Sequence, residues 1–149
     1  MKTLALSLIG LSLSLVTVWP AHGRDTRHLL PIASGLENKD AEGKLDGSIK
    51  FFFGAQQHPT ILTKLGTDVS NRKTNAVGKS DERACNWAFL SAMIALQNRA
   101  KQLGANAVVN IVSYYQKNVM SSETEFECHA GAVIAGVTLK GDFVKIADK

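Results

Sequence analysis

The sequence predicts an α+β domain in which one long helix packs on one face of a mostly antiparallel sheet of three or four strands. Residues 81–103 have helical periodicity, residues 107–115 are rich in β-branched and aromatic side chains, and residues 123–128 alternate strictly. The chain has 149 residues, of which 45% are hydrophobic and 20% charged. This length favours one domain, and the composition excludes global disorder.

The first segment has the pattern of a secretory signal peptide. Lys2 precedes an uncharged apolar run over residues 4–18, and Ala21-His22-Gly23 supplies small residues before Arg24. The rival interpretation, a transmembrane anchor, needs about 20 apolar residues. We therefore expect residues 1–23 to be removed and the remainder to be periplasmic or secreted. Without Lys2, 16 basic residues face 13 acidic ones. This balance is too mild to indicate binding to nucleic acid or to a membrane surface.

Export determines how the cysteines are interpreted. Cys85 and Cys128 are the only two in the chain, and an oxidising compartment favours a disulfide between them. Such a bond would close a loop of about 44 residues and stabilise the fold by roughly 4 kcal/mol in the chain-entropy model. Two alternatives stay open at this point: a pair of buried free thiols, or a metal site formed by Cys85, Cys128 and His129.

The residues between the signal peptide and the long helix have weak patterns. We expect residues 24–48 to form a loosely ordered lead-in with one short helix near 38–45, before a domain spanning 49–149. A strand is predicted over residues 49–53, stopped by a glycine. Pro59 is suited to open a short helical turn that Gly66 ends, and residues 67–79 resemble a loop or a ragged strand.

The long helix has recognisable ends. Ser80 or Asp81 can cap its start, and Gly104 follows its last residue in the position typical of a left-handed stop. At 100° per residue one apolar stripe forms, and we expect it to face the sheet. Its members are Cys85, Ala88, Phe89, Ala92, Leu96, Ala100 and Leu103.

A second apolar group lies almost opposite this stripe. It consists of Trp87, Leu90 and Ile94. One explanation is that the lead-in covers these side chains, and the other is that they form a candidate interaction surface for a second subunit or a partner.

Three strands are expected after the helix. The segment 107–115 is predicted to be central, and in 123–128 the side chains of Phe126 and Cys128 point inward while the glutamates form a solvated row. The inward parity changes after Cys128, which requires a bulge or break near Gly131. The last strand is expected to end at Gly141-Asp142, with residues 143–146 continuing it or folding back. Because Cys85 and Cys128 both face inward, a helix-to-sheet disulfide is plausible.

No motif indicates catalysis or a cofactor. Gly78-Lys79-Ser80 matches half of a phosphate-binding loop, but Lys73 stands where the first glycine belongs, so we do not expect ATP binding. His28, His58 and His129 have no metal-ligand spacing. The row of Glu123, Glu125 and Glu127 lacks the contrasting environments that acid–base pairs need. The basic residues Lys64, Arg72, Lys73, Lys79 and Arg83 are interleaved with Asp68, Asp81 and Glu82, which favours a solvated loop. A hydrolase would require His58 and His129 to converge with carboxylates in a deep pocket.

The segment 100–111, which reads AKQLGANAVVNI, resembles the helix-to-strand signature of the YbjQ-like family, also described as heavy-metal-binding domains. The resemblance extends over residues 49–146, and its specific part is this central dozen. Its secreted bacterial members are often labelled excinuclease ATPase subunits, a label that the broken phosphate loop and the signal peptide argue against. The segment is more distantly similar to the sensor domain of the outer-membrane lipoprotein in the Rcs envelope-stress system. The resemblance implies a small α+β domain that can assemble into rings and has no established catalysis. Metal binding does not carry over, because no ligand cluster is visible in the sequence.

Together these features predict a non-enzymatic periplasmic binding or envelope-associated interaction module, stabilised by one disulfide and able to self-associate. The alternative is a metal-binding protein that uses Cys85, Cys128 and His129.

Overall fold

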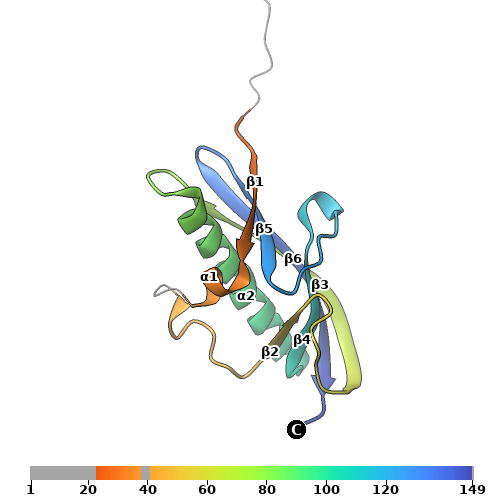
Figure 1. Cartoon of the computed structure of the whole chain (residues 1–149). Helices are drawn as coiled ribbons and strands as arrows, with labels where there is room; N and C mark the ends of the chain where they lie inside the picture. The colour runs from red at the N-terminus through yellow and green to blue at the C-terminus, as the bar shows by residue number, and fades with distance from the viewer. Residues whose placement is uncertain (1–22, 38–40, 149) are drawn as a thin grey trace, which may run out of the picture.

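The computed structural model describes residues 23–37 and 41–148 (Figure 1). The predicted signal peptide, apart from Gly23, lies outside the described residues. The elements are β1 (Thr26–Pro31), α1 (Ile32–Leu36), β2 (Lys50–Phe53), β3 (Ile61–Asn75), α2 (Asp81–Leu103), β4 (Ala107–Ser113), the 3-10 helix η2 (Tyr115–Lys117), β5 (Glu125–Ala130) and β6 (Ile134–Ile146).

Within the described residues the strands form one six-stranded mixed sheet. The strand order is β1-β5-β6-β4-β2, and β3 pairs with β6 outside this order. β5 pairs with the start of β6 and β4 with its later part, whereas β3 pairs with β6 along its whole length. The pair β2–β4 is parallel, whereas the pairs β1–β5, β3–β6, β4–β6 and β5–β6 are antiparallel. The α+β class is therefore confirmed. The predicted size of three or four strands is wrong, because β1 and β3 were not recognised as regular strands.

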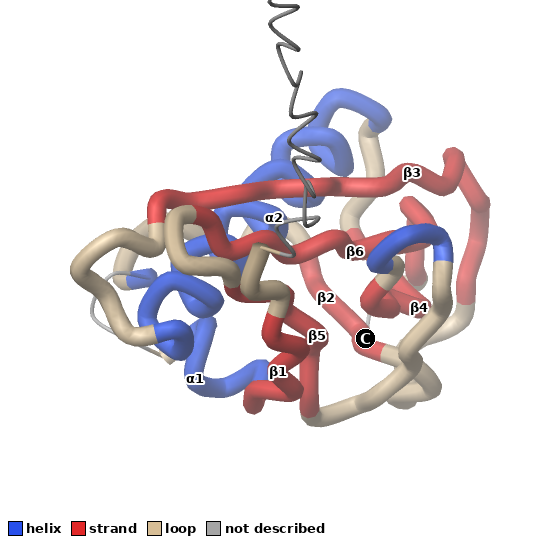
Figure 2. The backbone as a smooth tube through the Cα atoms, turned by 90° about the horizontal axis from the view of Figure 1, so that it is seen from above, coloured by secondary structure: helices blue, strands red, loops and turns tan. Residues whose placement is uncertain are grey.

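The helix α2 has the boundaries that the sequence predicts. The Ser80 hydroxyl accepts a hydrogen bond from the Arg83 N–H at 3.2 Å, and Gly104 ends the helix with φ 73°. Figure 2 shows α2 lying across one face of the sheet. Phe89 is fully buried there and stacks on Phe126 of β5, with 4.1 Å between ring centroids. This face holds the main core.

The expectation of a loosely ordered lead-in is wrong. Residues 26–31 form β1, which pairs with β5 from Thr26–Ala130 to Pro31–Glu125, and α1 follows directly and packs against α2. A short helix lies at 32–36, ahead of the predicted 38–45. In that predicted range residues 38–40 are outside the described part, Ala41 has a 3-10 conformation and residues 42–44 form a turn. β1 is stabilised by main-chain pairing with β5 and by charged partners on other elements. Its own apolar residues were therefore too few to predict a strand from the sequence.

The stretch predicted as a helical turn followed by a loop or a ragged strand is the 15-residue strand β3, so the helical turn is wrong and the strand alternative is correct. It pairs with β6 from Ile61–Ile146 to Asn75–Ile134, with irregularities near Thr63 and before Gly66. Gly66 therefore follows a bulge and does not end a helix. Most of the side chains of β3 are exposed, so the strand carries no apolar alternation by which it could be recognised.

The parity change after Cys128 marks the turn between two strands. The Gly131 N–H donates to the Ile134 carbonyl at 2.8 Å, which closes the turn between β5 and β6. The strand β6 does not end at Gly141-Asp142 but continues to Ile146, so of the two alternatives for residues 143–146 continuation is correct. A Cβ atom at Gly141 would lie 2.6 Å from the Val108 Cγ1 atom. The absence of a side chain there serves close packing of β6 against β4.

Candidate functional site

The disulfide joins α2 to the sheet. The sulfur atoms of Cys85 and Cys128 are bonded at 2.03 Å, their Cα atoms lie 5.8 Å apart, and both residues are fully buried. The predicted pairing is confirmed. The alternatives of free thiols and of a metal site using Cys85, Cys128 and His129 are wrong, because the bond leaves no thiolate to bind a metal.

The start of β1 is attached to the start of α2 by charge. The Arg24 guanidinium makes two hydrogen bonds to the Asp81 carboxylate, at 2.7 and 2.8 Å, and His28 Nε2 lies 2.9 Å from the same carboxylate. Arg24, more than His28, lowers the pKa of Asp81 to about 2 despite partial desolvation. Asp81, expected as part of a solvated loop, therefore attaches the lead-in to the helix.

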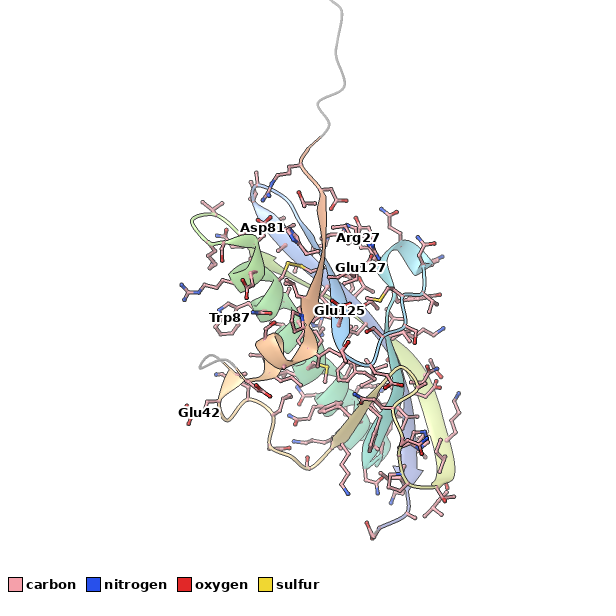
Figure 3. All side chains as sticks on the ribbon, in the orientation of Figure 1. Arg27, Glu42, Asp81, Trp87, Glu125 and Glu127 are labelled. Atoms are coloured by element: carbon pink, nitrogen blue, oxygen red, sulfur yellow. A yellow bond between two sulfur atoms is a disulfide. The ribbon has the colours of Figure 1, made fainter. Side chains whose placement is uncertain are left out.

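A second polar network connects β1, β5 and η2. His129 Nε2 lies 2.9 Å from a Glu127 oxygen and its Nδ1 lies 3.0 Å from an Asp25 oxygen, while Arg27 donates to Glu127 at 2.8 Å. The Glu127 side chain is only 10% exposed. Burial opposes its ionisation, but hydrogen bonds from Arg27 and His129 outweigh that effect, and the pKa of Glu127 is lowered. Figure 3 shows Arg27 and Glu127 near each other on the paired strands β1 and β5.

The expected row of three solvated glutamates is therefore only partly correct. Glu123 and Glu125 are exposed, whereas Glu127 is largely enclosed by its partners. The difference arises because Arg27 and His129 bond to the Glu127 carboxylate, whereas Glu125 lies opposite Pro31, which has no charged side chain.

Tyr115 completes this network. Its ring stacks on the His129 imidazole with 3.5 Å between centroids and 12° between planes, and its hydroxyl donates to Asp25 at 3.0 Å. Burial and the Asp25 carboxylate both raise the pKa of Tyr115. Both ring nitrogens of His129 face carboxylates, so neither is free to act as a base towards a substrate.

A hollow of about 410 Å³ lies beside this stack. Besides His129 and Tyr115, its wall includes Lys73 and the exposed apolar residues Val133 and Ile134. No serine, threonine or cysteine is among the described residues that line it. The hollow can receive an apolar or anionic group.

His58 does not join this hollow. It lies at a separate hollow of about 310 Å³ with Lys50, Phe52 and Pro59, and its Nδ1 is 2.8 Å from the Pro59 carbonyl oxygen. The structure therefore does not bring His58 and His129 together, as a hydrolytic site would require. Among the described side chains, no group of three or more His, Cys, Asp or Glu is placed to hold a metal ion.

The second apolar group of α2 is divided. Leu90 is fully buried, so it cannot belong to the predicted interaction surface. Burial is the outcome expected if the lead-in covers this side of the helix. Helix residues on its side bind the lead-in: Asn86 accepts from Ser34 at 3.0 Å, and Gln97 accepts from the Asp46 N–H at 3.1 Å. Trp87 and Ile94 remain partly exposed, and Figure 3 shows Trp87 pointing away from β5.

No pattern in the sequence indicated the free edge of β3. β6 occupies one edge of this strand, and no strand among the described residues pairs with the other. Figure 2 shows β3 at the rim of the sheet. Ile61, Leu62 and Val69 are 41%, 65% and 43% exposed along it. Unpaired main-chain groups on a long edge are a template for strand addition.

A groove of about 290 Å³ separates this part of β3 from α2. Asp68, Ser70 and Arg72 line it from the strand, and Arg99 lines it from the helix, 3.3 Å from Asp68. Ser70 is 6% exposed and its hydroxyl has no hydrogen-bond partner, the one such buried side-chain atom among the described residues. A buried hydroxyl without a partner is costly.

Comparison of the sequence with protein-family models and with curated proteins gives no match. No helix within residues 23–37 and 41–148 is long and apolar enough to cross a membrane. The fold and site define an α+β protein with a buried disulfide, in which the polar side chains around His129 are mutually paired.

Proposed function

We propose that this chain is a non-catalytic interaction module of an oxidising envelope compartment, periplasmic or extracellular, exported by residues 1–23. The observation that carries the proposal is the buried bond between Cys85 and Cys128, with both residues 0% exposed. Structural disulfides of this kind persist in oxidising compartments and are rare in the cytosol.

The absence of catalysis in this proposal is supported by the bonding of the titratable side chains. His129 is enclosed by Asp25, Glu127 and the Tyr115 ring. Asp81 is neutralised by Arg24. A catalytic base needs a free lone pair within reach of a substrate proton, and these groups use their polar atoms to attach β1 to the domain.

The proposed contact element is the open edge of β3. Strand addition supplies main-chain hydrogen bonds to a partner without requiring a deep pocket. The face formed by Trp87 and Ile94 is the second candidate. Its apolar residues are less exposed than Leu62 and Val69 of β3, and this difference favours the strand.

Membership of the YbjQ-like family is also part of the proposal. It is supported by segment 100–111, in which the last turn of α2, Gly104 and β4 follow one another as the signature implies. This membership would fit assembly into an oligomer and gives no reason to expect an enzyme.

The test is expression of the full chain in a bacterium, followed by fractionation and native mass spectrometry of the released protein. We expect cleavage before Arg24, a mass two hydrogens below that of the dithiol form, and an assembled species. A chain that stays in the cytoplasm with two free thiols would contradict the proposal. So would an exported protein that binds neither itself nor any envelope protein in a reciprocal purification.

Assembly is then compared between two sets of variants by light scattering. Val69→Lys changes the β3 edge, and Trp87→Glu with Ile94→Glu changes the helix face. We expect the first to reduce assembly and the second to leave it unchanged. The reverse result would move the contact to the helix.

A further inference from the structure

We propose that the free edge of β3 pairs with the β3 edge of a second copy, antiparallel about a two-fold axis through Ser70, to give a dimer with one continuous sheet. This inference rests on the proposed function and specifies its partner and register. It starts from the regular part of the strand, Gly66–Asn75, which pairs one residue to one with β6 and has no bulge. A straight, unbroken edge of this length is what strand addition needs.

Symmetry restricts the possible registers. Two antiparallel edge strands related by a two-fold axis perpendicular to the sheet keep their faces, so opposite residues have the same parity. Asp68, Ser70 and Arg72 all line the groove beside α2, and an axis at Ser70 places these three residues opposite the same three residues of the second copy.

Among axes at Gly66, Asp68 and Ser70, charge and strand regularity favour Ser70. An axis at Ser70 places Asp68 of each copy opposite Arg72 of the other, so that the pair is formed twice. An axis at Asp68 would place Lys64 opposite Arg72, and like charges directly opposite destabilise a sheet. An axis at Gly66 would also pair Asp68, with Lys64, but it would extend pairing into the irregular residues before Gly66. The Ser70 register matches Gly66–Thr74 with itself and includes almost all of the regular stretch.

The unpaired hydroxyl gives an independent reason for the same axis. Ser70 is 6% exposed and its hydroxyl has no hydrogen-bond partner among residues 23–37 and 41–148. At the axis the two Ser70 side chains are directly opposite, with Cβ atoms about 4.5–5.5 Å apart. Each hydroxyl can then bond to the other, which removes the cost of burial without a partner.

The first experiment measures the dimer dissociation constant of the mature, oxidised protein by sedimentation velocity over a concentration series. We expect Asp68→Arg and Arg72→Asp each to raise that constant at least about tenfold, since symmetry introduces each like-charge contact twice. The double variant D68R/R72D restores opposite charges and is expected to recover the dimer. Arg99→Ala is the matched control, because it removes the intramolecular partner of Asp68 and leaves the inter-subunit pair intact.

The second experiment tests the register directly. Ser70→Cys places the new thiols opposite each other at the axis and is expected to give a covalent dimer under mild oxidation. In Arg72→Cys the two thiols would be separated by about four residues along the strands, roughly 13 Å, and should not crosslink. Thermal unfolding of every variant checks that the domain is folded.

The outcomes separate the two proposals. A monomer at every concentration overturns self-pairing. It leaves the proposed function standing, because export, oxidation and binding to another protein are measured separately by fractionation and native mass spectrometry. A dimer that ignores the charge swap, or that crosslinks equally through Arg72→Cys, overturns the register at Ser70. Recovery by D68R/R72D together with selective crosslinking of Ser70→Cys supports it.

Discussion

Glu127 and His129 lie two residues apart on the same face of β5 and are joined at 2.9 Å, with side chains 10% and 13% exposed. Their other partners, Arg27 and Asp25, come from the segment that leads into and forms β1. The pair therefore attaches the N-terminal strand to the sheet through charge as well as through main-chain pairing.

Replacement of Glu127 by Gln should destabilise the protein. The change leaves Arg27 without its carboxylate and weakens the support of His129, so we expect the free energy of unfolding at pH 7 to fall by about 1–3 kcal/mol. Glu125→Gln on the same strand is the matched control and should change it by less than about 0.5 kcal/mol, because Glu125 is exposed. Urea denaturation measures both values. Equal effects would mean that Glu127 is no better paired than its neighbour.

Removal of the disulfide should have a larger effect. The bond links residues separated by 43 positions, so the Cys85→Ala/Cys128→Ala variant is expected to lose roughly 4 kcal/mol of unfolding free energy in the chain-entropy model. Urea denaturation of the oxidised protein and the double variant gives the difference. The oxidised protein with and without reductant serves as a second comparison. Unchanged stability would show that the bond does not constrain the unfolded chain.

Asp81 should make stability depend on pH at the acid end. Since its folded pKa is lowered to about 2 by Arg24 and its unfolded pKa is about 4, the stabilisation is complete above about pH 4 and is lost as pH falls towards 2. The difference in unfolding free energy between the natural chain and Asp81→Asn should therefore shrink over that interval. Glu82→Gln, at the neighbouring exposed position, should show no such change. Parallel curves for the natural chain and Asp81→Asn would contradict the assignment.

Leu90 and Ile94 should respond differently to truncation. Leu90 is 0% exposed, so Leu90→Ala is expected to lower the free energy of unfolding by about 2–5 kcal/mol through lost burial and a cavity. Ile94 is partly exposed, and Ile94→Ala removes a similar volume with a smaller loss. Thermal and urea unfolding give both values. A larger loss at Ile94 would place that residue, and not Leu90, under the lead-in.

An element could be predicted from the sequence where its signal comes from residues close to it in the chain. The ends of α2 were correct because Ser80 and Gly104 act on the turns beside them. The disulfide was correct because Cys85 and Cys128 share the inward faces of their elements. The strand β3 was predicted only as a helical turn followed by a loop or a ragged strand, because its stability comes from residues about 60–85 positions away, such as Leu139 opposite Ser70.

The candidate site could be predicted only in part. Trp87 and Ile94 were identified as apolar residues off the main stripe, but the burial of Leu90 depends on where the lead-in lies. The stack of Tyr115 on His129 left no spacing pattern, since the two residues belong to η2 and β5. Glu127 could not be separated from Glu125 by sequence, because alternation gives both the same face.

By itself the sequence determined the α+β class, the extent of the long helix, the pairing of the two cysteines and the lack of any recognisable catalytic motif. These follow from periodicity, capping and composition, which act over a few residues. Tertiary structure alone decided that β1 and β3 join the sheet and that, among the described residues, one edge of β3 stays open. It also decided that Glu127 pairs with Arg27 and Asp81 with Arg24. The physical reason is that main-chain pairing and desolvation of charge depend on which distant segments meet.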